Sequence, residues 1–207
     1  MNNTNKRILQ TTEDLIVAIL LGNSIIETNE KESVIRFQIM NERVKVLENF
    51  IEFNQLSYLP LKNTAPGEYI LQQDITLKRI LTDLTQNNKV KYIDPALLNV
   101  NMFMLWFSLF GYKGDRKVYI TSNIDEAAKK TLVEQLRANL ELEISAVPKR
   151  FIIHSASRLA YLSILHKRPQ YETSILIQMA NEKERKKLSQ LIDDREEGII
   201  QDVKFGL

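Results

Sequence analysis

Two apolar runs constrain the fold of this chain more than any other part of its sequence. Residues 13–27 read EDLIVAILLGNSIIE, and residues 101–119 read NMFMLWFSLFGYKGDRKVY. Each run is long enough for about three helical turns, and in each a glycine precedes residues typical of a strand. Small side chains one turn apart let two helix backbones come close, so the helices are expected to pack on each other, although two separate buried helices would look the same. The small residues are Ala18, Gly22, Ser108 and Gly111.

The residues that follow each run carry matching strand and helix signals. SVIRFQI alternates, with Ile35 and Phe37 on one face and Arg36 on the other, as a half-buried strand does. KVYITSN alternates in the same way after the second run, and a helix is expected over 125–139 with Asn123 as its cap. Each half has the order helix, strand, strand, helix, strand or turn, helix. This order favours an α/β (α+β) chain of two pseudo-equivalent halves.

No Gly/Ser-rich linker separates the halves, so one compact monomer is expected. The expected segments are a polar arm over 1–12, a first repeat over 13–98, a second repeat over 99–180 and a charged extension over 181–207. Thr12 is expected to cap the first helix. The stretch 59–69, with two prolines and a glycine, is expected to be a loop or a hairpin turn, and 155–165 a helix.

Composition narrows the classes of protein without selecting one. The 207 residues are 44% hydrophobic and 26% charged, with a net charge of only +2, which argues against a large, purely electrostatic nucleic-acid footprint. The absence of cysteine excludes disulfides and thiolate ligands. No apolar window is long enough to span a membrane, so no membrane partner is expected. The many Asn, Ile and Lys residues suggest an A+T-rich coding genome, such as that of an organelle or an intracellular bacterium, so a mitochondrial or other intracellular location is expected.

Taken together, the runs LIVAILLGNSIIE and MLWFSLFGYKGDRKVYITSN and the elements after them resemble the LAGLIDADG homing endonucleases in their single-chain, two-repeat form. The resemblance covers roughly residues 13–180 and is carried by loose motifs. It implies two αββαββα-like repeats, paired signature helices and a saddle of antiparallel sheet that grips nucleic acid.

The chemistry of that family needs one acidic residue at the foot of each signature helix, because hard carboxylate oxygens hold the divalent cations there. At the matching positions this chain has Asn23 and Phe110, and neither can replace a carboxylate. Asp115 and Glu27 are nearby but out of register. The nuclease centre is therefore expected to be lost, leaving no enzyme activity and no metal or other cofactor.

The candidate nucleic-acid contacts lie after the two signature helices. Arg36, Gln38, Lys117, Tyr119 and Thr121 are expected on outward strand faces, where such side chains can contact base edges, although a solvated sheet face would look similar. Further candidates are Lys113 and Arg116, in a basic turn interleaved with Tyr112 and Tyr119, and Lys149 and Arg150 in the second hairpin turn. Basic residues at the end of a helix are also ordinary capping. His154 and His166 lack a metal-ligand spacing.

These observations favour a protein that binds nucleic acid without cleaving it, with RNA slightly preferred to DNA. The resemblance implies an intron-splicing helper or a structural RNA-bound role. Three alternatives stay open: a structural subunit of an organellar ribonucleoprotein such as the mitochondrial ribosome, a non-cleaving DNA-binding protein, and an active endonuclease with unusual ligands.

Overall fold

The computed structural model describes residues 3–28, 32–114, 117–154, 159 and 170–196. It divides into two compact units, Met1–His154 and Ser155–Leu207. Each unit is described by itself.

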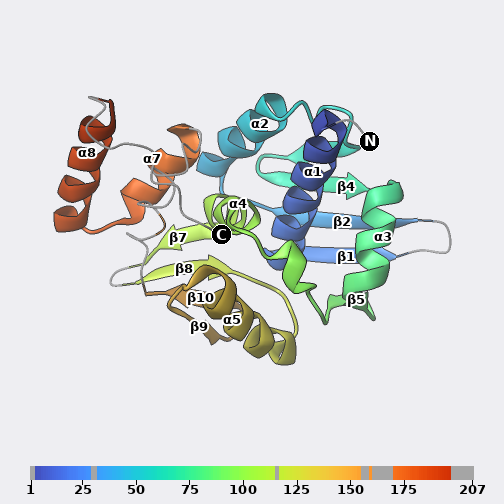
Figure 1. Cartoon of the computed structure of the whole chain (residues 1–207). Helices are drawn as coiled ribbons and strands as arrows, with labels where there is room; N and C mark the ends of the chain where they lie inside the picture. The colour runs from blue at the N-terminus through green and yellow to red at the C-terminus, as the bar shows by residue number, and fades with distance from the viewer. Residues whose placement is uncertain (1–2, 29–31, 115–116, 155–158, 160–169, 197–207) are drawn as a thin grey trace. The chain divides into compact units, whose positions relative to one another are not determined.

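The first half of the larger unit is a four-stranded antiparallel sheet with helices packed on one face (Figure 1). The strands lie in the order β1-β2-β4-β3, and β3 and β4 form a hairpin. The elements are α1 (Asn3–Leu21), β1 (Ser24–Thr28), β2 (Ser33–Gln38), α2 (Val44–Phe53), β3 (Leu61–Ala65), β4 (Glu68–Gln72) and α3 (Ile75–Leu84).

The second half repeats this arrangement. Its sheet has the order β7-β8-β10-β9, which matches the first sheet strand for strand. The elements are α4 (Val100–Phe110), β7 (Gly111–Lys113), β8 (Val118–Thr121), α5 (Glu126–Leu140), β9 (Ile144–Val147) and β10 (Arg150–Ile153). Between the halves lie the short strands β5 (Thr85–Gln86) and β6 (Lys89–Val90) and the 3₁₀ turn η2 (Pro95–Leu97). The helix expected over 155–165 falls, except for Leu159, outside the described residues.

The core of the larger unit is formed by α1 and α4 with the inward faces of the two sheets. Alternation places Ile35 and Phe37 of β2 inward and Arg36 outward, as the sequence predicts. Trp106 is fully buried in α4 and packs edge-on against Phe151 of β10. In the part of the chain that is described, no helix has both the length and the hydropathy to cross a membrane.

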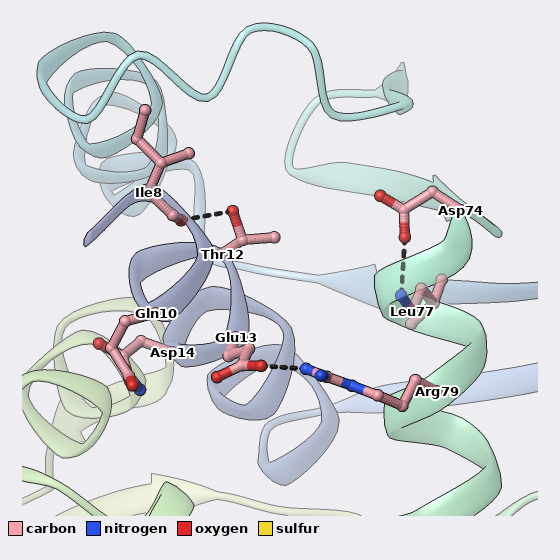
Figure 2. Close-up of polar contacts among 8 residues, drawn as sticks. All are labelled: Ile8, Gln10, Thr12, Glu13, Asp14, Asp74, Leu77 and Arg79. Carbon is pink, nitrogen blue, oxygen red and sulfur yellow. Dashed lines mark hydrogen bonds and ion pairs between the residues drawn. The ribbon is translucent and has the colours of Figure 1, made fainter. Parts of the chain in front are cut away.

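Two expectations about local structure were wrong, and a third was right only in part. The segment expected to be a polar arm belongs to α1, which begins at Asn3. Thr12 does not cap that helix, because its hydroxyl donates to the Ile8 carbonyl one turn earlier (Figure 2). The same hydroxyl also contacts the Tyr58 hydroxyl at 2.6 Å. The stretch 59–69, expected to be a loop or a hairpin turn, contains β3 and the start of β4, and the hairpin turn between them is confined to Pro66 and Gly67.

In the smaller unit, the structure describes α7 (Gln170–Met179) and α8 (Glu182–Glu196). Asn181 and Glu184 cap α8 reciprocally: the Glu184 amide donates to the Asn181 side chain at 2.9 Å, and the Asn181 amide donates to the Glu184 carboxylate at 3.0 Å. A helix was expected in the charged extension, and its tail lies outside the described residues.

Candidate nucleic-acid interface

Helices α1 and α4 pack against each other at the centre of the larger unit (Figure 1). At the N-terminus of α4, the Asn99 side chain caps the helix by accepting from the Met102 amide and donates at 2.7 Å to the buried carboxylate of Asp14 on α1. Asp14 also accepts from Gln10, as Figure 2 shows. This end of the pair is fixed by polar contacts that the small-residue spacing does not reveal.

At the C-terminal ends of the two helices, the close approach that the small residues predict is present at Gly22. A Cβ atom there would lie 2.5 Å from the ring of Phe110, which is far inside contact distance. Gly111 has a different role: a Cβ atom there would meet the carbonyl oxygen of Phe107, in its own helix, at 2.4 Å. Gly22 therefore packs the two helices together, and Gly111 allows α4 to end.

The two halves are also joined by reciprocal hydrogen bonds at the helix ends. The Asn123 backbone amide donates to the Gly22 carbonyl at 3.1 Å, and its side chain donates to the Ser24 carbonyl at 3.2 Å. In the opposite direction, Arg43 donates to the Gly111 carbonyl at 3.4 Å. The expectation that Asn123 caps α5 was wrong, because Asp125 accepts from the Ala127 amide and takes that role.

Arg43 is buried, and burial lowers its pKa because the guanidinium loses its hydration. Its Nε atom has no hydrogen-bond partner. Sequence reasoning missed Arg43 and the bridging role of Asn123, since both depend on contacts between halves.

Neither helix end carries a carboxylate. Strand register shows that Asn23 and Phe110 occupy corresponding places in the two halves. Each directly precedes a residue that pairs with the last inward side chain of the next strand. In the first half Ser24 pairs with Phe37, and in the second half Gly111 pairs with Ile120. If the two halves are instead aligned on Gly22 and Gly111, the residue that corresponds to Phe110 is Leu21, which is also apolar.

A divalent cation requires hard oxygen ligands, and these helix ends do not provide a fitting set. Within the described residues, no group of three or more His, Asp or Glu side chains is arranged to hold a metal ion.

A cavity of about 190 Å³ opens at the helix ends. Its lining comes from both halves: Asn23, Gln38, Ile39 and Met40 from the first, and Leu109, Phe110, Tyr112 and Thr121 from the second. None of these residues is charged. Thr121 donates its hydroxyl to the Phe110 carbonyl at 3.4 Å, so it is held against the end of α4.

The outward face of the second sheet carries an aromatic–arginine cluster, which we define as Tyr112, Tyr119 and Arg150. The two tyrosine rings stack with centroids 5.3 Å apart and an interplanar angle of 23°. The Arg150 guanidinium lies 4.3 Å from the centre of the Tyr119 ring and donates to the Tyr112 hydroxyl at 3.1 Å. The hydrogen bond to Tyr112 raises the pKa of Arg150, and an arginine is cationic at every working pH.

The outward face of the first sheet is different, because its cations are matched by acids. Arg36 forms a two-point ion pair with Glu27, at 3.1 and 3.4 Å, and this contact raises the pKa of Arg36. Register places Lys62 on the same face, together with Glu68. A contact between Arg36 and a base edge, as the sequence predicts, would therefore compete with the ion pair to Glu27.

The remaining candidates take separate places. Gln38 is exposed at the end of β2, and Lys117 is exposed beside β8. Lys113 pairs with Val118, so its side chain emerges on the opposite side of β7 from Tyr112. Lys149 occupies the β9–β10 turn with a φ of 60°, while Arg116 lies outside the described residues. The structure thus brings together Tyr119, Thr121 and Arg150 on adjacent strands, and separates Lys113 from them.

The imidazole ring of His154 shares a hydrogen bond with the Ser145 hydroxyl at 2.9 Å, and His166 is not described. The expectation of no histidine site stays a prediction.

Comparison with known proteins finds solved structures that share this fold. No protein-family model and no curated protein matches this sequence. Solved structures do match, and one of them is the homing endonuclease I-WcaI bound to its DNA recognition sequence. That structure agrees with a TM-score of 0.56 at 16% sequence identity, over 81% of this chain and 86% of the other. The expected LAGLIDADG-type fold, with two repeats and paired helices, is confirmed.

Proposed function

We propose that this chain is a LAGLIDADG-type protein that binds nucleic acid without cleaving it, with unpaired RNA its preferred ligand. The observation that carries the proposal is the aromatic–arginine cluster on the outward face of the second sheet, beside helix ends that lack carboxylates.

Binding is supported by the chemistry of this cluster. Aromatic faces stack on bases of any sequence, and a guanidinium can contact a phosphate or the face of a base. Arg150 is exposed, and Tyr112 and Tyr119 are partly exposed, so the cluster can be reached from solvent. The structural neighbour I-WcaI is bound to DNA, which supports nucleic acid as the class of ligand for this fold.

Loss of cleavage is supported by the residues at the helix ends. Cleavage of the family type requires two converging carboxylates for the cations, and this chain offers Leu21, Asn23 and Phe110 instead. Phe110 also occupies the space that Gly22 leaves, so the contact between the helices depends on an apolar ring at that position.

A preference for RNA is supported by the unequal charge of the two sheets. A DNA duplex is held mainly through its phosphates, which requires many uncompensated cations. On the first sheet, Arg36 is already paired with Glu27, and Glu68 shares the face. Sequence-specific recognition of RNA uses unstacked bases on aromatic side chains, which the cluster provides.

The test compares fluorescence anisotropy of the purified full chain with single-stranded RNA, single-stranded DNA and duplex DNA. We expect the tightest binding with single-stranded RNA. A randomised duplex library incubated with Mg²⁺ or Mn²⁺ is expected to stay uncut. Sequence-specific double-strand breaks, or no binding to any of the three ligands by the folded protein, would contradict the proposal.

A second candidate is a structural subunit of a ribonucleoprotein, in which one sheet contacts protein. The first sheet favours this candidate for two reasons. The cations on its outward face are matched by acids, and Ile25 on the same face is 57% exposed beside Glu27. Size fractionation of lysate from the native cell tests this candidate: the chain should migrate with ribosomal particles and stay with them at high salt. Migration as a free monomer would argue against it.

A further inference from the structure

The cavity at the helix ends has an apolar interior and a polar rim. Its buried lining residues are apolar: Leu109 and Phe110 from α4, and Ile39 from the first half. A cavity of about 150 Å³ lined by apolar side chains accommodates benzene, so one of about 190 Å³ has room for a single planar ring system.

The rim has hydrogen-bonding groups without intramolecular partners. Among the described residues, the side-chain amides of Asn23 and Gln38 form no hydrogen bond, and both side chains are exposed. An amide offers donors and an acceptor in one plane, which is the pattern that matches the edge of a base. Neither a carboxylate nor a cation is among the lining residues, so a metal ion or a lone phosphate lacks a counter-charge there.

Tyr112 joins the cavity to the aromatic–arginine cluster. It lines the cavity, stacks on Tyr119 and holds its hydroxyl on Arg150. A strand with one base in the cavity would therefore have its neighbouring base beside an aromatic surface and its backbone beside a cation. This continuity favours a nucleic-acid base over an unrelated small aromatic ligand.

We propose that the cavity between the ends of α1 and α4 binds one unpaired nucleobase, whose edge is contacted by the amides of Asn23 and Gln38. The inference rests on the proposed function and makes it more specific: the ligand is an RNA segment with an unstacked base, held where an active member of the family would hold its cations.

The probes are five fluorescein-labelled RNA hairpins that are identical except at a single-nucleotide bulge. Four carry one of the four bases at the bulge, and the fifth carries an abasic ribose. We expect the unaltered full chain to bind at least one base-containing hairpin about ten-fold or more tightly than the abasic hairpin, because a good two-point base contact discriminates at that level. Anisotropy titration measures each affinity.

Two variants test the cavity itself. The double substitution Asn23→Ala and Gln38→Ala removes both amides, and Asn23→Phe fills the opening with a ring. Both should bring the ratio of affinities for base-containing and abasic hairpins close to one, while affinity for the abasic hairpin stays unchanged. Gln72→Ala is the matched control, since Gln72 lies on the outward face of the same sheet but not in the cavity. It should keep the full preference.

The outcomes separate this inference from the proposed function. If the unaltered chain binds all five hairpins equally, the cavity does not hold a base, and the proposed function still stands. If the preference persists in both variants with unchanged circular dichroism, the base binds elsewhere and the inference is wrong. If no hairpin and no single-stranded RNA binds to the folded protein, the proposed function and the inference both fail.

Discussion

Gly22 and Phe110 occupy one space between α1 and α4. Because a methyl group at position 22 would overlap the buried ring, Gly22→Ala should overpack this contact and lower the free energy of unfolding by about 1–3 kcal/mol. Urea unfolding followed by circular dichroism measures the change.

The coupling between the two positions provides the control. Phe110→Leu alone should lose stability because a buried ring is removed. In the Gly22→Ala background the same change should relieve the overlap, so the double variant should be more stable than the sum of the single effects predicts. Simple additivity would mean that the ring and the glycine do not share this space.

Tyr119 is the central member of the proposed binding cluster, since its ring stacks on Tyr112 and lies under Arg150. Tyr119→Ala should weaken binding to single-stranded oligouridine by about 1–3 kcal/mol, the range for loss of one stacking platform. Anisotropy titration measures this change. Tyr92→Ala is the matched control, because Tyr92 is 53% exposed and belongs to neither sheet. Equal losses from the two substitutions would show that the cluster is not the site.

At the scale of single elements, α3 shows how one type of side chain acts oppositely at the two ends of a helix. Asp74 is its cap, accepting from the Leu77 amide at 2.7 Å (Figure 2), and Asp83 is exposed in its last turn. Asp74→Ala should destabilise the protein by about 1 kcal/mol. Asp83→Ala should be neutral or stabilising by about 0.3 kcal/mol, since it removes an anion from the negative end of the helix dipole. Thermal unfolding of both variants measures the difference, and equal signs would contradict the capping role.

The packing of α1 on α4 depends on Ala18, which is fully buried one turn before Gly22 on the same helix face. Ala18→Leu should cost about 1–3 kcal/mol, because the extra carbons have no space in a packed core. The same substitution at Ala127, which is exposed on α5, should leave the unfolding midpoint nearly unchanged. If Ala18→Leu also leaves the midpoint unchanged, the close pairing of the helices through this face is incorrect.

Across the whole larger unit, the cations of the second sheet are available to phosphates, whereas the cations of the first sheet are matched by acids. Replacing Lys117 and Arg150 together by Ala should flatten the plot of log affinity against log salt for single-stranded RNA by about 1.4, or about 0.7 for each lost phosphate contact. Replacing Arg36 and Lys62 together is the matched control. It should change the slope much less, because Arg36 already pairs with Glu27. Equal changes in slope would mean that both sheets contact phosphates.

The sequence by itself determined the type and order of most elements. Alternation in SVIRFQI fixed which side of β2 is buried, and the apolar stripe at helical spacing fixed the buried face of α5. It also shows no carboxylate at either helix end, since the residues there are Leu21, Asn23 and Phe110 in either alignment of the two halves. It placed the start of α1 too late, because polar residues 3–12 show little apolar periodicity, although they belong to the helix in the structure.

Only the tertiary structure decided which distant residues meet. Periodicity shows which face of an element is buried, but not what lies opposite it. The bond from Arg43 to Gly111, the bridge from Asn123 to Ser24 and the cation–π contact of Arg150 with Tyr119 all join separate elements. The ion pair that occupies Arg36 and the cavity shared by both halves arise in the same way. Such contacts depend on the packing of two sheets around one helix pair, and no local pattern in the chain specifies that packing.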